Sequence, residues 1–322
     1  MLLHLRVIAP PARTPDVLRM LTGAAGVTNV IELPGAGRRP EGDLVMFEVT
    51  REGANAVIEH LKELGIAEDG SIAAERVDLS LSRVADEAEE QVPGAPDDAV
   101  VWDELAAQVS DDCRVTWAFL TFLVIATLLA AIGVILPSLI VIVGGMVLGP
   151  EFGPVAAMSF GLLRRDGRLV VTAMRALVIG FLVAITFTWA CAVLLELLGW
   201  IGPQTLNGHD EVDFIVKPDR WSFIVALLAG AAGVLSITAG KSSAIIGVFI
   251  SVTTVPAAGY AAVAAATRRW DEVTGSVAQL SVNITGMVIA GLVTLLVQRL
   301  VWSRYGLRIT PPAARRRRDS SV

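Results

Sequence analysis

The sequence predicts an α+β, ferredoxin-like N-terminal domain followed by an all-α membrane domain whose six spans form a 3+3 inverted repeat. Three observations lead to this prediction. Charged and apolar residues are segregated along the chain, a βαββαβ pattern fills the first 82 residues, and two apolar stretches interrupted by Gly and Pro recur about a hundred residues apart.

Composition divides the chain into two unlike parts. Of the 322 residues, 54% are hydrophobic, and the mean hydropathy of +0.63 is far above that of an ordinary soluble chain. Residues 1–113 carry 9 Lys/Arg against 22 Asp/Glu, whereas residues 114–322 carry 17 against 10. We therefore expect an acidic, water-soluble domain before a membrane domain. The pI near 5 argues against nucleic acid as a partner.

The first 82 residues alternate between strand and helix patterns. Val17, Leu18 and Leu21 follow helical spacing after Thr14, a potential cap, and Pro15, which suits the first helical position. The expected elements are a strand over 2–9, a helix over 14–21, strands over 27–33 and 44–49, a helix over 53–64 and a strand over 71–81, with a turn at Pro34, Gly35 and Gly37. This order is the split βαβ arrangement of ferredoxin-like domains, although another small α+β fold would fit the same pattern.

Residues 83–113 are predicted to be an acidic linker that contains a short amphipathic helix over 100–109, with Trp102 at the lipid headgroups. The membrane domain is expected over residues 114–303, and a basic cytoplasmic tail over 304–322. The six spans are predicted at about 115–136, 138–163, 169–198, 221–239, 242–267 and 273–302, each long enough to cross a bilayer.

Lys and Arg placement predicts the orientation in a cell (inner) membrane. With the N-terminal domain and the C-terminus in the cytoplasm, Arg164, Arg165 and Arg168 lie inside and the acidic loop 200–220 lies outside. The pair Arg268-Arg269 is the exception, because six spans leave it outside. Two cysteines, with neither disulfide nor metal spacing, suit a reducing cytoplasm.

Two interrupted apolar stretches are the centre of the prediction. The first is Val141–Pro154 (VIVGGMVLGPEFGP), in which Pro150 and Pro154 each remove a helical hydrogen bond, and the second is Ser242–Gly259. When Pro150 is aligned with Pro256, Gly180 falls on Gly286 and spans one to three match spans four to six. Because three is odd, the second copy is inverted, which explains Arg268-Arg269. The alternative is a chance alignment of two proline-kinked apolar segments.

Inverted repeats with interrupted helices at matching places point to a transporter-like site near the membrane midplane. Glu151 is the first candidate, as a cation or proton ligand, unless the break ends at an interface where the carboxylate is solvated. Thr and Ser near a kink often serve only to bond freed carbonyls, and Asn283 would serve equally well as an interhelical hydrogen bond. The candidate substrate or ion site comprises Gly149, Pro150, Glu151, Gly153, Pro154, Ser251, Thr253, Thr254, Pro256 and Asn283. Four arginines of the tail, Arg315, Arg316, Arg317 and Arg318, are expected to bind anionic lipid headgroups.

The two interrupted stretches and the last span resemble those of a family of bacterial and archaeal membrane proteins known as domain of unknown function 389, or the uncharacterised hydrophobic domain. The matching motifs are Gly144-Gly145-Met146 with Pro150 and Gly153-Pro154, then Gly240-Lys241-Ser242-Ser243-Ala244 through Gly247-Val248 to Val255-Pro256, and Asn283. The resemblance covers roughly residues 110–303, and a ferredoxin-like N-terminal domain also fits such proteins. Two departures are Glu151, where an apolar residue is expected, and Ala257, where a second proline is usual. The resemblance implies a fold and no defined activity.

The sequence favours transport of a small solute or ion, with a soluble domain that regulates or oligomerises the protein. Membrane lipids, a second copy of the chain and a small-molecule ligand of the soluble domain are the expected partners. The alternative is a membrane-anchored sensor or assembly scaffold. We find no zinc spacing, P-loop, GxSxG or HExxH pattern, so neither an enzyme nor a cofactor or metal site is expected.

Overall fold

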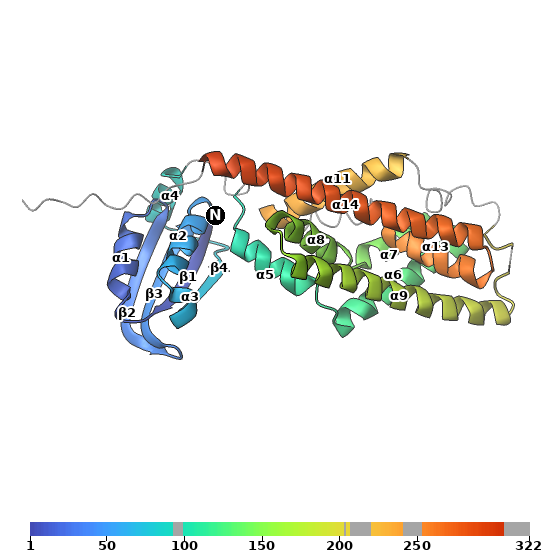
Figure 1. Ribbon diagram of the computed structural model, residues 1–322, viewed down its shortest axis with the longest axis horizontal. Helices are drawn as coiled ribbons and strands as arrows, with labels where there is room; N and C mark the ends of the chain where they lie inside the picture. Colours follow the sequence, from blue (N-terminus) through green and yellow to red (C-terminus); the bar gives the residue numbers. More distant parts are fainter. Residues whose placement is uncertain (93–98, 203, 207–219, 241–252, 306–322) are drawn as a thin grey trace, which may run out of the picture. The chain divides into compact units, whose positions relative to one another are not determined.

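A four-stranded antiparallel sheet forms the framework of Met1–Asp103, which is the larger part of the first of two compact units and is called the first unit below. The computed structural model describes residues 1–92, 99–202, 204–206, 220–240 and 253–305 (Figure 1). The sheet contains β1 (Leu2–Ala9), β2 (Val27–Arg38), β3 (Glu41–Thr50) and β4 (Ser71–Arg76) in the order β2-β3-β1-β4. Because β3 lies between β1 and β2, and all neighbouring strands are antiparallel, the sheet has the split βαβ order that the sequence predicts.

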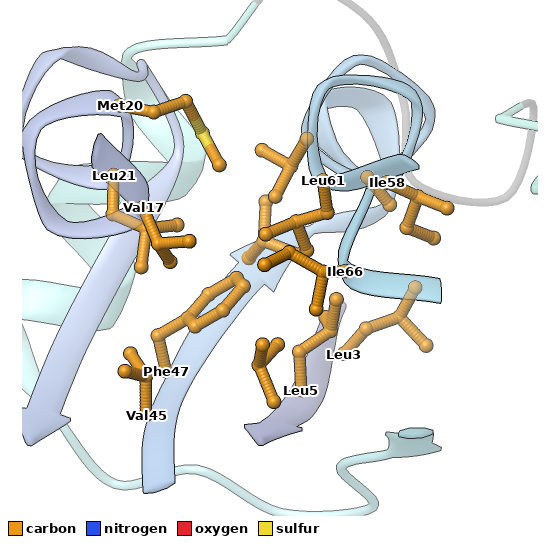
Figure 2. Close-up of a cluster of buried hydrophobic side chains, with 14 of the residues drawn as sticks. Leu3, Leu5, Val17, Met20, Leu21, Val45, Phe47, Ile58, Leu61 and Ile66 are labelled. Atoms are coloured by element: carbon orange, nitrogen blue, oxygen red, sulfur yellow. The ribbon is translucent and has the colours of Figure 1, made fainter. Parts of the chain in front are cut away.

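Helices cover one face of this sheet and complete a continuous core. They are α1 (Thr14–Gly23), α2 (Arg51–Glu63) and the short α3 (Ile66–Asp69). Figure 2 shows side chains of β1 and β3 pointing toward the helices. Leu5, Val45 and Phe47 from the strands meet Val17 and Leu61 from the helices, and all five are fully buried. Strand alternation and helical spacing therefore place their apolar residues in one core, as their periodicities require.

Three details of this unit differ from the prediction, and the first is that the last strand ends at Arg76 and not at residue 81. The segment Pro34–Gly37 is not a turn, because β2 continues through it to Arg38 with a register shift between Leu33 and Gly37. β2 is an edge strand, where the missing proline N–H costs no ladder hydrogen bond. Thr14 is not the helix cap either: its hydroxyl donates to Oδ2 of Asp43 at 2.7 Å, and Arg13 precedes the helix.

The segment expected to be a linker is partly folded onto the first unit. Residues Arg83–Glu90 form helix α4, which begins where the Ser82 hydroxyl accepts a hydrogen bond from the Ala85 amide. Farther on, the Asn55 side chain donates to the Val100 carbonyl at 2.6 Å and accepts from the Trp102 amide at 3.0 Å. The predicted amphipathic helix is present as α5, Trp102–Asp112. The prolines Pro93 and Pro96 lie outside the described residues.

Apolar helices make up the second unit, Glu104–Arg299. They are α6 (Trp117–Ile135), α7 (Leu139–Leu148), α8 (Phe152–Arg164), α9 (Gly167–Leu197), α11 (Arg220–Ala239), α13 (Thr254–Ala266) and α14 (Trp270–Tyr305), and Figure 1 labels each. Four of the helices in the described ranges, α6, α9, α11 and α14, are long and apolar enough to cross a membrane, and the bent pair α7 and α8 can form a fifth span. These helices identify the chain as a membrane protein. The first half of the predicted span 242–267 lies largely outside the described residues, which begin again at Thr253.

Glycines allow the helices of this unit to approach closely. A side chain at Gly145 of α7 would place its Cβ 2.8 Å from the Ala126 carbonyl oxygen of α6. At Gly230 of α11, the Cβ would lie 2.4 Å from the Met287 carbonyl oxygen of α14. Close contact through small residues is the usual way that membrane helices associate.

Candidate binding site

The second predicted span is broken between α7 and α8. The two helices are bent by 52° at Gly149–Glu151, the three residues between them. Gly149 has an extended backbone that ends α7, and Glu151 is the residue that caps α8. Pro150 therefore lies in the break, as predicted. Pro154 does not break the helix, because it is the third residue of α8, where no intrahelical amide partner is needed.

Helix α13 has the same local design as α8. Both contain 13 residues, and Pro256 is the third residue of α13 as Pro154 is of α8. By its place in the helix, Pro256 therefore resembles Pro154 rather than Pro150. Glu151 and Thr253 each immediately precede their helix.

Glu151 is buried at the start of α8, with 5% of its surface exposed. Oε1 accepts a hydrogen bond of 2.6 Å from the Thr254 hydroxyl, on the first residue of α13. Oε2 is also buried and has no hydrogen-bond partner among the described residues. A Cβ at Gly149 would lie 2.2 Å from Oε2, so only glycine at this position accommodates the carboxylate as it stands. The structure thus brings Gly149, Glu151 and Thr254 together.

A second polar contact joins the neighbouring Thr253 to α14. The Thr253 hydroxyl accepts hydrogen bonds from Nδ2 of Asn283 at 2.9 Å and from Nε2 of Gln279 at 3.4 Å. Asn283 is 2% exposed, and Gln279 and Ser276 are fully buried. Oε1 of Gln279 and Oγ of Ser276 have no hydrogen-bond partner within the described ranges. Two adjacent threonines therefore connect the Glu151 carboxylate to a polar face of α14.

Sequence reasoning missed Gln279 and Ser276, although a signal was present. Ser276, Gln279 and Asn283 are spaced three and four residues apart, so they follow one face of an otherwise apolar helix. A polar side chain in a membrane helix costs free energy unless it is bonded, so three on one face indicate a shared environment.

The remaining predicted site residues do not join this cluster. Gly153 packs against Asp112 of α5, where a Cβ would lie 2.8 Å from the Asp112 Cβ. Pro154 and Pro256 are buried within their helices. Ser251 lies outside the described residues, as do the four tail arginines 315–318. Among the residues that the structure describes, no group of three His, Cys, Asp or Glu side chains could hold a metal ion.

The segment of the chain that contains this site matches a known protein family. Residues 146–289, which include Glu151, both threonines and Asn283, match the model of the family described as "Domain of unknown function (DUF389)". The predicted resemblance is therefore confirmed over this segment. The chain is also similar to an uncharacterized protein from Methanocaldococcus jannaschii, at 22% identity over 236 residues that cover 72% of this chain and 70% of the relative. No solved structure matches significantly.

Proposed function

We propose that this DUF389-like protein transports a small solute or ion across the inner membrane, and that its site lies where α8, α13 and α14 meet. One observation carries the proposal: Glu151 is buried in a broken membrane helix, with Oε1 bonded to Thr254 and Oε2 without a partner in the described residues. Placing an ionisable group inside a membrane costs free energy, and in membrane proteins such groups mark ion and substrate pathways.

We propose further that the six predicted spans form an inverted repeat. Besides the matched α8 and α13, two glycines support this pairing. Gly180 of α9 packs against Phe119 of α6, and Gly286 of α14 packs against Phe223 of α11, so each proposed repeat contains a long helix that packs through a glycine against a phenylalanine of its first helix. Repeats of this kind place binding sites at the repeat interface, between discontinuous helices.

The orientation with both termini in the cytoplasm remains a proposal that rests on Lys and Arg placement. Arg165 directly follows α8 and Arg268 lies two residues after the end of α13, and both have a left-handed backbone conformation. In an inverted repeat these two arginines lie on opposite sides of the membrane.

The first unit fits a regulatory or oligomerising role. β2 is an edge strand whose Val30, Ile31 and Leu33 are 43%, 49% and 44% exposed. Edge strands with exposed apolar side chains favour pairing with another chain, so we propose a homo-oligomer. A small-molecule ligand of this unit and lipid binding by the tail are further proposals, as is the absence of enzymatic activity.

The same edge strand favours the second candidate function, a membrane-anchored sensor or assembly scaffold. In that case the polar groups around Thr253 and Thr254 would only hold helices together. The two functions predict different effects when the Glu151 charge is removed. A neutral side chain of the same shape preserves helix packing but abolishes ion binding.

Uptake into liposomes tests the proposed function. Wild-type protein, Glu151→Gln and a control, Glu196→Gln, are reconstituted and assayed with a panel of inorganic ions, amino acids and small organic acids. Glu196 lies near the end of α9, so its variant removes a carboxylate from the same unit at another place. We expect wild type and Glu196→Gln to transport at least one solute and Glu151→Gln to lose more than about tenfold of that rate. Equal uptake by all three, or none by wild type, would favour the scaffold.

A further inference from the structure

The polar cluster around Glu151 contains buried oxygen atoms that have no hydrogen-bond partner among the described residues. Nδ2 of Asn283 and Nε2 of Gln279 both donate to Thr253, and the Thr254 hydroxyl donates to Glu151. The buried atoms that lack a partner among the described residues are oxygens: Oε2 of Glu151, Oε1 of Gln279 and Oγ of Ser276. Buried oxygen acceptors without donors are a cost that a bound ligand can offset.

We propose that the ligand of this site is a monovalent cation held by Oε2 of Glu151. This inference rests on the proposed function and specifies the charge of the transported or coupled ligand. A cation is bound by oxygen atoms, and the unpartnered oxygens include two pure acceptors, Oε2 of Glu151 and Oε1 of Gln279, beside the Ser276 hydroxyl, which can also accept. An anionic ligand would instead need donors and would be repelled by the carboxylate.

The backbone at the break adds acceptors to the side chains. Helix α7 ends at Leu148, where the Met146 carbonyl accepts a 3.4 Å hydrogen bond from the Gly149 amide and Pro150 has no N–H to offer the last turn. In transporters, unwound carbonyls and helix C-terminal ends coordinate Na⁺ or protons, whereas helix N-terminal ends favour anionic groups. Glu151 itself is the anionic group at the start of α8, so the N-terminal end of the helix stabilises the carboxylate that a cation would bind.

Charge favours a monovalent ion over a divalent one. No Lys, Arg or His forms a salt bridge with Glu151 in the described part of the chain, and no group of three His, Cys, Asp or Glu lies around it. Divalent ions are usually bound by several carboxylates, whereas a single carboxylate with neutral oxygens balances one positive charge. An alkali metal ion and a proton share this chemistry.

Thermal unfolding of the full-length protein in detergent tests the cation. The melting temperature is measured in NaCl, KCl and choline chloride at constant ionic strength, and separately across pH 5–8, for wild type, Glu151→Gln, Gln279→Leu and Glu196→Gln. We expect Na⁺ or K⁺ to raise the melting temperature of wild type and Glu196→Gln by several degrees relative to choline, because a ligand that binds the folded state stabilises it. Glu151→Gln should lose the shift, and Gln279→Leu should require about tenfold more cation for the same shift.

The outcomes separate the proposals. A pH-dependent melting temperature that Na⁺ and K⁺ leave unchanged, and that Glu151→Gln removes, identifies the cation as a proton. A cation effect that persists in Glu151→Gln, or stabilisation by anions that depends on Glu151, overturns the inference. If Glu151→Gln does not fold, an unchanged cation requirement in Gln279→Leu overturns it equally. Cation binding without uptake in liposomes would end the transport proposal alone, whereas Glu151-dependent uptake of a solute without any cation effect would end this inference alone.

Discussion

The Thr254 hydroxyl donates a 2.6 Å hydrogen bond to the Glu151 carboxylate, and the two residues stand at the starts of α13 and α8. This contact joins helices that lie far apart in sequence. It also gives the buried carboxylate a bonded oxygen, Oε1, and leaves the other oxygen without a partner in the described residues.

Thr254→Val should test the contribution of this bond, because valine keeps the shape of threonine and removes the donor. A hydrogen bond to a charged group contributes about 1.5–3 kcal/mol, and its loss leaves a buried acceptor unpaired. We expect the free energy of unfolding to fall by that amount in Thr254→Val and to recover in Thr254→Ser. Equal stabilities of Thr254→Val and wild type in denaturant unfolding would contradict the assigned contact.

Gly145→Ala tests the close approach of α6 and α7. Its Cβ would lie 2.8 Å from the Ala126 carbonyl oxygen and 3.0 Å from the Ala130 amide nitrogen, and backbone atoms cannot move aside easily. We expect a loss of about 1–3 kcal/mol from overpacking. Gly144→Ala is the matched control, because its Cβ meets nothing within 4 Å, and removing a helix glycine should be neutral or stabilise by up to about 1 kcal/mol. Similar losses in both variants would argue against this packing.

A fragment of residues 1–103 should have a larger free energy of unfolding than a fragment of residues 1–82. The longer fragment retains α4, the buried Val101 and the two hydrogen bonds of Asn55. Losing the three buried valines Val92, Val100 and Val101 and leaving a half-buried amide unpaired should cost at least about 2–4 kcal/mol. Urea unfolding followed by circular dichroism measures the difference, and equal midpoints would show that residues 83–103 contribute nothing to the unit.

Asp43 should make this unit sensitive to acid. The Gly35 amide donates to its carboxylate at 2.8 Å and the Thr14 hydroxyl at 2.7 Å, and these bonds, the Gly35 bond first, lower the pKa of Asp43 below its usual 3.8. Because the unfolded chain then binds the proton more readily than the folded one, the stabilisation is present above about pH 4 and is lost as pH falls through the folded pKa. Asp43→Asn should remove this part of the pH dependence. An unchanged acid limb in the stability profile would contradict the assignment.

How much of the fold the sequence predicts depends on the kind of interaction that determines each element. Periodicity predicts β1, α1 and α2 closely, because their apolar residues must face one core. It misses the path of β2 through Pro34, which depends on that strand being at the sheet edge, and it misses α4, whose two buried alanines give a weak apolar signal.

In the membrane unit, sequence reasoning selected Glu151, Thr253, Thr254 and Asn283, and the structure joins them in two linked contacts. It does not distinguish Pro150, which lies in the break, from Pro154, which lies in the first turn of α8, because a proline in the sequence does not reveal whether it breaks a helix or begins one. The helical spacing of Ser276, Gln279 and Asn283 is visible in the sequence, but only the structure places Gln279 beside Thr253.

Sidedness of Arg165 and Arg268 tests most directly the central proposal, that α8 and α13 are inverted counterparts whose first residues meet at one site. Both residues are exposed and lie just after α8 and α13, so Arg165→Cys and Arg268→Cys can each be introduced into a full-length protein with Cys113 and Cys191 replaced by serine. A membrane-impermeant maleimide applied to intact cells should label the Arg268→Cys protein, and should label the Arg165→Cys protein after the membrane is opened. Labelling of both from the same side would contradict the inverted repeat and the transport site built on it.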